Sequence, residues 1–192
     1  MPSPVTFYFD LGSPFAYLAA ERLESVLGPE VVWQPVSLGG LFKLAGRGSW
    51  ALGDDRRRKA GMADIERRAH RNGLPPMRWP DQWPTHYLLA MRATTFAYRV
   101  GAGRAFTTAA FRLAFREGRD LALADNVREA ARRVGLDADR IEEHAHDPAI
   151  KEELRAATGA AFARGVFGVP TVAVGDRLFW GDDRLEDAAA EV

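Results

Sequence analysis

The chain has 192 residues, enough for one well-packed domain or for a small domain that carries a large insertion. Its 26 basic side chains equal its 26 acidic ones, so no net basic field favours nucleic acid, and we expect no such partner. The absence of cysteine excludes structural disulfides, thiolate zinc sites and dithiol exchange by the protein itself, so any sulfur chemistry must come from a ligand.

The N-terminal residues, MPSPVTFYFDLG, lack a basic stretch followed by an apolar run of signal-peptide length. No window of the chain approaches the roughly 18 uninterrupted apolar residues of a membrane-spanning helix. We therefore expect a cytoplasmic protein that has no membrane partner.

The first forty residues predict a strand, a helix and a second strand. The segment PVTFYFD is β-branched and aromatic and stops at Gly-Ser-Pro, which places Ser13 at the N-cap of a helix and Pro14 at its first position. Apolar residues at helical spacing extend this helix over 14–27, and VVWQPVSL predicts the next strand. Such a unit makes the two strands parallel, with a right-handed connection.

Residues 41–163 predict helices throughout. Segments such as THYLLAMRATTFAYRV and FTTAAFRLAFREG repeat apolar residues every three or four positions. Asp125 and Asp147 stand just before helical runs, and we interpret both as helix caps rather than catalytic groups.

The C-terminal segment returns to a strand pattern after GVFGVP. TVAVGD and RLFW predict a hairpin around Gly175 and Asp176, and GDDRLEDAAAEV predicts a last helix opened by acidic residues. The sequence therefore predicts an α/β fold, in which 1–40 and 164–192 form one βαβ-ββα domain and 41–163 form an inserted, all-helical domain that folds together with it.

Three places in this fold could carry chemistry. Ser13 could cap its own helix or donate to an external anion in front of the helix N-terminus, where backbone N–H groups are unpaired. Pro170 could enter its strand after a cis bond, which would let the backbone of Val169 pair with an extended peptide ligand; an ordinary turn explains the same residues. Asp182 and Asp183 could stabilise the start of the last helix, capture an ammonium group, or do both.

Together these features resemble the 2-hydroxychromene-2-carboxylate isomerases and kappa-class glutathione transferases, which are relatives of the disulfide oxidoreductase DsbA and have a thioredoxin-like fold. The resemblance covers essentially the whole chain. It is carried, in the family's order and spacing, by FYFDLGSPFAYLA, PVSLGGLFKLAG, MRA, ARGVFGVPT and LFWGDDRL.

The resemblance implies that glutathione, or another low-molecular-weight thiol, supplies the missing sulfur. Ser13, with Pro14 and Phe15 at the start of the helix, would meet the thiol, and Ser13 would be the catalytic donor. Val169 and Pro170 would bind the cysteinyl backbone. The γ-glutamyl end would be held by Asp182 and Asp183.

The substrate side of the resemblance is less regular. Lys43 in LFKLAG matches the family's lysine and is the candidate partner for a substrate carboxylate and developing oxyanion. Arg47 stands where the family usually has an asparagine, and His86 stands near another such position. His86 could bind substrate or could simply begin a helix. His144 and His146 lack the i, i+4 spacing of metal ligands, so we expect no metal.

The sequence thus predicts a glutathione-dependent isomerase of an aromatic-catabolism intermediate similar to 2-hydroxychromene-2-carboxylate, with a small aromatic substrate. The resemblance also implies a homodimer. Two alternatives stay open: a glutathione transferase or peroxidase of kappa type, and a non-catalytic thioredoxin-like module that binds a peptide or partner beside Val169.

Overall fold

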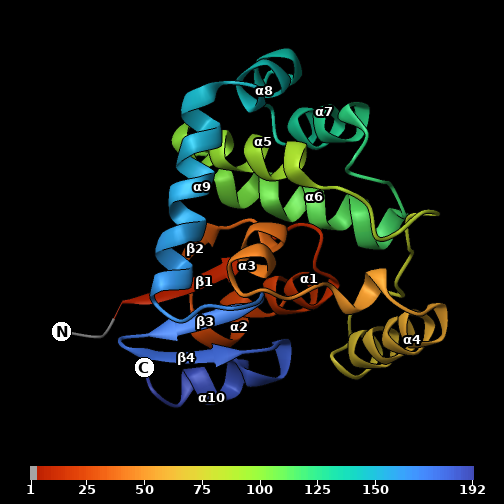
Figure 1. The fold of residues 1–192 in the computed structure, drawn as a ribbon, viewed down its shortest axis with the longest axis vertical. Helices are drawn as coiled ribbons and strands as arrows, with labels where there is room; N and C mark the ends of the chain where they lie inside the picture. The colour runs from red at the N-terminus through yellow and green to blue at the C-terminus, as the bar shows by residue number, and fades with distance from the viewer. Residues whose placement is uncertain (1–3) are drawn as a thin grey trace.

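The computed structural model describes residues 4–192 and shows a four-stranded sheet at one end of a block of helices (Figure 1). The strands are β1 (Val5–Phe9), β2 (Val32–Pro35), β3 (Thr171–Val174) and β4 (Arg177–Trp180). Their order in the sheet is β2-β1-β3-β4, with β1 parallel to β2 and antiparallel to β3. This arrangement confirms the predicted βαβ-ββα sheet with a large helical insertion.

The helices before the insertion and after it lie against the sheet. These helices are α1 (Pro14–Ala20), α2 (Leu23–Leu27), α3 (Leu38–Leu44) and α10 (Leu185–Ala189). The insertion contains α4 (Asp55–Arg71), α5 (Leu88–Arg99), α6 (Gly103–Glu117), α7 (Ala124–Arg133), α8 (Ala138–Ala145) and α9 (Pro148–Ala163). Two short 3-10 turns, η1 (Trp50–Leu52) and η2 (Asp182–Arg184), complete the elements.

Alternation along β1 divides the core between the two faces of the sheet. Phe7 and Phe9 point into the larger apolar cluster, which also contains residues of α1, α5 and α6. Tyr8 points the opposite way, into a smaller cluster with Leu41 of α3 and Ala161 of α9. Because side chains alternate across a strand, one run of aromatic residues serves both faces.

The first predicted helix is broken in two. We expected one helix over 14–27, but the backbone of Arg22 (φ −111°, ψ −14°) interrupts it between α1 and α2. Long-range contacts hold the break: the buried carboxylate of Glu21 accepts hydrogen bonds from Arg112 and Arg116 of α6, and Arg22 pairs with Glu186 of α10. Apolar periodicity carries no information about such contacts.

Two further details differ from expectation. Asp147 caps α9 by accepting from Ala149 N at 2.9 Å, as predicted. Asp125, in contrast, lies inside the first turn of α7, whose N-cap is Leu123. The acidic segment before the C-terminus begins as the 3-10 turn η2, and only then continues as α10.

The division into 1–40 with 164–192 and 41–163 stays a prediction. Helix α3 continues across position 40, while α9 ends at Ala163, next to the second predicted boundary. One apolar cluster joins the sheet to the insertion, since Phe9 of β1 packs on Phe111 of α6 with ring centroids 6.1 Å apart.

Within residues 4–192, no helix combines the length and apolarity that crossing a membrane requires.

Candidate functional site

Ser13 lies in the turn between β1 and α1 and is almost completely buried, with 4% of its surface exposed. Its Oγ accepts a hydrogen bond from Ala16 N at 3.2 Å and so caps α1. The same hydroxyl donates to the carbonyl oxygen of Val169 at 3.4 Å, a long and therefore weak bond. The two interpretations of Ser13 are compatible, because its lone pair caps the helix while its proton faces another segment.

The loop before β3 turns its backbone toward Ser13. The Val169–Pro170 peptide bond is cis, which is the first of the two interpretations that the sequence left open, and a second cis bond at Trp83–Pro84 was not foreseen. Within the described residues, the N–H groups of Val169 and Phe15 donate to no protein acceptor. Two backbone donors and one hydroxyl therefore converge where the start of α1 meets this loop.

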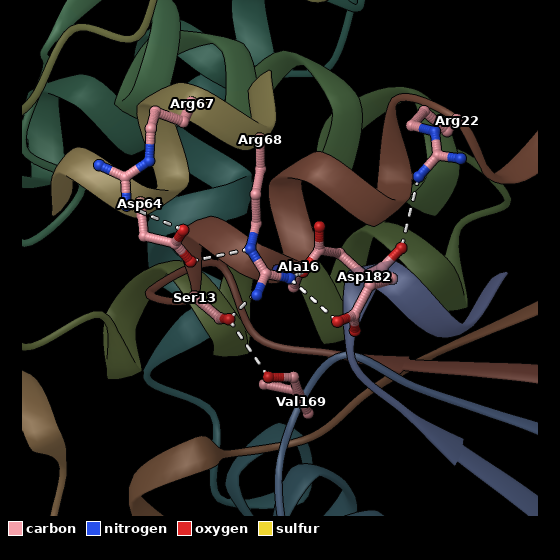
Figure 2. A network of polar contacts seen from close by, with 9 residues as sticks. Ser13, Ala16, Arg22, Asp64, Arg67, Arg68, Val169 and Asp182 are labelled. Carbon is pink, nitrogen blue, oxygen red and sulfur yellow. Dashed lines mark hydrogen bonds and ion pairs between the residues drawn. The ribbon is translucent and has the colours of Figure 1, made fainter. Parts of the chain in front are cut away.

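Arg68 of α4, in the helical insertion, reaches the start of α1 and the acidic turn η2 (Figure 2). Its Nη1 lies 2.8 Å from Asp182 Oδ1 and 3.3 Å from Asp183 Oδ2, and its Nε donates to Asp64 at 2.9 Å. The guanidinium also lies 5.4 Å from the ring centroid of Phe15, the second residue of α1. The predicted residues Phe15, Asp182 and Asp183 thus share one cationic partner.

The two adjacent acids are in different environments. Asp182 is 2% exposed, and burial raises the pKa of its carboxyl, which Arg68 opposes and Asp183 reinforces. The side chain of Asp183 is 61% exposed and meets Arg68 at its edge. Asp183 can therefore receive an external ammonium group, whereas the carboxylate of Asp182 is already occupied by Arg68.

Sequence reasoning missed Arg68. The only local signal is its i, i+4 spacing from Asp64, which is typical of an ordinary pair on a solvent-facing helix. Its contacts with Asp182 and Asp183 join positions 114 and 115 residues further along the chain, and no periodicity indicates them.

The predicted substrate residues are spread more widely. Lys43 is exposed on α3, and no ion pair joins it to an acidic group of the described residues. Arg47 is exposed, and its guanidinium lies 5.5 Å from the ring centroid of Phe167 in the loop before β3. His86 is exposed just before α5, near the buried Asp10 beneath the Ser13 turn; burial raises the pKa of Asp10, and His86 slightly opposes this rise.

An exposed aromatic pair borders the Val169 loop and was also missed. Phe167 and Trp180 are 38% and 51% exposed, and their rings meet edge to face with centroids 4.9 Å apart. Trp180 comes so close to Gly168 that a Cβ there would lie 2.8 Å from the indole Nε1. Arg47, Phe167 and Trp180 therefore form one surface beside the loop, which we call the aromatic ledge.

Three tryptophans near the start of α1 belong to the core or pack against it. Trp50 packs on Phe15 and on Trp83, and Trp83 packs on Trp79, with ring centroids 6.3, 5.8 and 4.8 Å apart. Trp83 is only 7% exposed. This row of rings supports the start of α1 from behind and leaves the aromatic ledge as the accessible aromatic surface beside the Val169 loop.

A hollow of about 820 Å³ lies elsewhere, along α6. Four arginines line it, Arg104, Arg112, Arg116 and Arg133. Arg112 and Arg116 are held by Glu21, and Arg133 is held by Glu117. Because carboxylates of the protein already hold three of these arginines, we take the Ser13 region as the candidate site, where the N–H groups of Val169 and Phe15 have no protein acceptor within residues 4–192.

This geometry defines the class of protein: a thioredoxin-like domain with a helical insertion, in which a serine occupies the helix start opposite a cis-proline. The family model of the DSBA-like thioredoxin domain matches residues 4–192. The chain belongs to this family of DSBA-like thioredoxin domains.

Curated relatives narrow the comparison. The 2-hydroxychromene-2-carboxylate isomerase of Sphingobium xenophagum is 34% identical over 194 residues, covering 97% of this chain and 96% of the relative. The isomerase of that name from Pseudomonas putida is 29% identical over 188 residues, covering 94% and 90%. A solved structure of 2-hydroxychromene-2-carboxylate isomerase matches with a TM-score of 0.83 and 25% identity, over 97% of this chain and 92% of the other. The chain is therefore homologous to these isomerases over its full length.

Proposed function

We propose that the protein is a glutathione-dependent isomerase that acts on an aromatic-catabolism intermediate similar to 2-hydroxychromene-2-carboxylate. One observation carries the proposal: the hydroxyl of Ser13 and the backbone of Val169 face each other in a chain that has no cysteine. The full-length similarity to isomerases of this name supports the reaction type. The small aromatic substrate, the cytoplasmic location and the homodimer belong to the same proposal.

The residues at the start of α1 fit a peptide thiol. Val169 offers an unpaired N–H and a carbonyl that accepts only the weak bond from Ser13, as an added extended strand would require. The free N–H of Phe15 and the hydroxyl of Ser13 are donors for a sulfur held between them. When bound, glutathione would supply the thiolate nucleophile that the chain lacks.

The hydroxyl of Ser13 has a definite task in this proposal. A free thiol has a pKa of about 8.5, so only a few per cent is ionised at neutral pH. A hydrogen bond to a charged acceptor contributes about 1.5–3 kcal/mol, and 1.36 kcal/mol is one pKa unit. If the O–H of Ser13 turned from Val169 O and donated its hydrogen bond to the sulfur instead, it would lower the thiol pKa by about 1–2 units.

Because the first helix is broken after α1, local hydrogen-bond donors matter more than the helix macrodipole for stabilising a thiolate. Helix α1 has only seven residues, so its macrodipole is smaller than that of the continuous helix expected over 14–27. The hydroxyl of Ser13 and the N–H of Phe15 would therefore carry most of the stabilisation of the thiolate.

Arg68 and Asp183 suit the γ-glutamyl end, which carries an ammonium and a carboxylate on one carbon. The exposed carboxylate of Asp183 would take the ammonium, and the guanidinium of Arg68 would take the carboxylate. Asp182 would act through Arg68, since it holds Nη1 at 2.8 Å. This refines the role that the resemblance implied for the two acids.

The aromatic ledge suits a flat substrate that carries a carboxylate. Phe167 and Trp180 would stack against the ring, and Arg47, which lies over Phe167, would pair with the carboxylate. Lys43, exposed on α3, is the second candidate for that anion and for the developing oxyanion. Isomerisation neither adds atoms to the substrate nor removes them. The chain must therefore bind the substrate, orient it and stabilise the charge that develops.

The test is a titration of the purified protein with glutathione, in which thiolate absorbance is followed against pH, together with turnover of 2-hydroxychromene-2-carboxylate. We expect a bound thiol with a lowered pKa and an isomerised product that carries no glutathione. A product that carries glutathione, or oxidised glutathione, would instead support a transferase or peroxidase. Peptide binding without any thiol activation would support the non-catalytic module and overturn the proposal.

A further inference from the structure

Asp10 is a buried carboxylate directly beneath the proposed site, and the chemistry above does not use it. It follows β1, is 6% exposed, and lies three residues before Ser13. A buried carboxylate is costly unless it is hydrogen-bonded, so its partners indicate what it holds in place.

The two oxygens of this carboxylate bind two different segments. Oδ1 accepts from Gly12 N at 2.7 Å, within the Ser13 turn, and Oδ2 accepts from Leu38 N at 2.7 Å, at the first residue of α3. The main-chain carbonyl of Asp10 also accepts from Ser13 N at 3.0 Å. One residue therefore holds both the Ser13 turn and the helix that carries Lys43.

Strand topology brings these two segments together. β1 and β2 are parallel neighbours, with Phe9 paired to Pro35, so the chain leaves both strands at the same edge of the sheet. The first strand continues into the Ser13 turn and the second into α3. Asp10 accepts hydrogen bonds from both of these segments.

We propose that Asp10 is a positioning residue, which sets the hydroxyl of Ser13 relative to helix α3 and so aligns the thiol side of the site with its substrate side. The site that it positions is the one under the proposed function, on which this inference rests.

The surroundings of Asp10 restrict how it can act. Burial has the largest effect on the pKa of Asp10, and His86, from the segment before α5, slightly opposes it. From the same segment, Tyr87 packs so closely that a Cβ on Gly12 would lie 2.8 Å from its ring. From the β2–α3 junction, the neighbouring groups are the uncharged Leu38 N–H and the hydroxyl of Ser37, which caps Gly40 N. Burial outweighs these effects and raises the pKa of Asp10 to about 6.

The first test uses the native protein without glutathione. The amide resonances of Gly12 and Leu38 are followed by NMR while the pH is changed, and we expect both to move with one common midpoint, because one carboxyl binds both. Separate midpoints, or no titration of either amide, would overturn the proposal. This result is independent of whether the protein binds a thiol.

The second test compares Asp10→Asn with Thr158→Val. Thr158 is a matched control, since it is 4% exposed and accepts from Ser37 N at 2.9 Å at the same helix start but does not touch the Ser13 turn. We expect Asp10→Asn to reduce kcat by about tenfold to a hundredfold, as misplacement of a reacting group does, and Thr158→Val to change it little.

The direction of the thiol pKa separates positioning from simple charge. Loss of alignment withdraws Ser13 from the sulfur, so Asp10→Asn should raise the pKa of the bound thiol. Removal of a negative charge alone would lower that pKa, and such a result would overturn the positioning role. If the native protein ionises no thiol at all, the proposed function fails, while the amide titration still decides the role of Asp10.

Discussion

The hydroxyl of Ser13 lies 3.4 Å from the carbonyl oxygen of Val169, a residue 156 positions further along the chain. The contact joins the start of α1 to the loop before β3, so the first and last parts of the sheet domain meet there. Because the bond is long, exchanging Val169 O for a stronger acceptor costs little. The proposed thiolate is such an acceptor.

Substitution of Ser13 by alanine tests this exchange. In Ser13→Ala we expect the pKa of bound glutathione to rise by about 1–2 units and kcat to fall by about tenfold to a hundredfold, because the donor to the sulfur is lost. Loss of the N-cap should also lower the free energy of unfolding by about 1 kcal/mol. Thiolate absorbance against pH and urea unfolding measure the two effects.

Asp147→Ala is the control for the capping effect. It removes the N-cap of α9, so it should destabilise the protein without changing the thiol pKa. If Ser13→Ala kept the full depression of the thiol pKa, the role would pass from the hydroxyl to the N–H groups of Phe15 and Val169.

The sequence predicted the fold better than it predicted the site. The strands, the hairpin and the Ser13 cap follow from alternation, turn residues and capping rules, which act within a few positions. Arg68, Phe167 and Trp180 could not be found this way, because their partners lie in other segments. The break at Arg22 has the same origin, since contacts with α6 and α10 hold it.

The ion pair between Arg68 and Asp182 gives a prediction about pH. In Arg68→Gln the buried carboxyl of Asp182 loses its cation, which should lower the free energy of unfolding by about 1–3 kcal/mol at neutral pH. Burial already raises the pKa of Asp182, and the substitution raises it further. A raised carboxyl pKa gives stability that is present at low pH and lost as the pH rises, so the stability that Arg68→Gln lacks relative to the native protein should grow as the pH rises above about 4.

Urea unfolding of the native protein and of Arg68→Gln at several pH values measures this deficit. Arg155→Gln is the control, since its pair with Glu152 is exposed and should change stability little at any pH. An Arg68→Gln deficit that stayed constant across this range would show that Asp182 does not depend on Arg68 for its charge.

Asp10 should make its own contribution to the pH dependence of stability. Its pKa is raised from 3.8 to about 6 in the folded protein, so ionising it costs the native state about 3 kcal/mol once the pH is above that value. The cost is absent at low pH and develops as the pH rises from about 4 to about 7. Asp10→Asn carries no charge, so its stability relative to the native protein should improve over that interval.

The difference between the two unfolding curves is the quantity to measure, because the other titrating groups then cancel. Thr158→Val, which removes an uncharged hydrogen bond at the same junction, should differ from the native protein by an amount that does not depend on pH. A pH-independent difference for Asp10→Asn as well would contradict a raised pKa at Asp10.

The aromatic ledge predicts a separation between substrate binding and thiol activation. Arg47→Ala should raise the KM for a carboxylate substrate by about fivefold to tenfold, because an exposed charged contact contributes about 1 kcal/mol, and Arg47→Lys should restore part of the loss. The thiol pKa and the free energy of unfolding should hardly change, since the side chain of Arg47 is exposed and its guanidinium lies over the partly exposed ring of Phe167. Arg177→Ala is the matched control, because Arg177 also lies 5.5 Å from an aromatic ring, that of Phe179, and should leave KM unaltered. Equal KM values for Arg47→Ala and the native enzyme would remove the ledge from the substrate site and leave Lys43 as the candidate for the carboxylate.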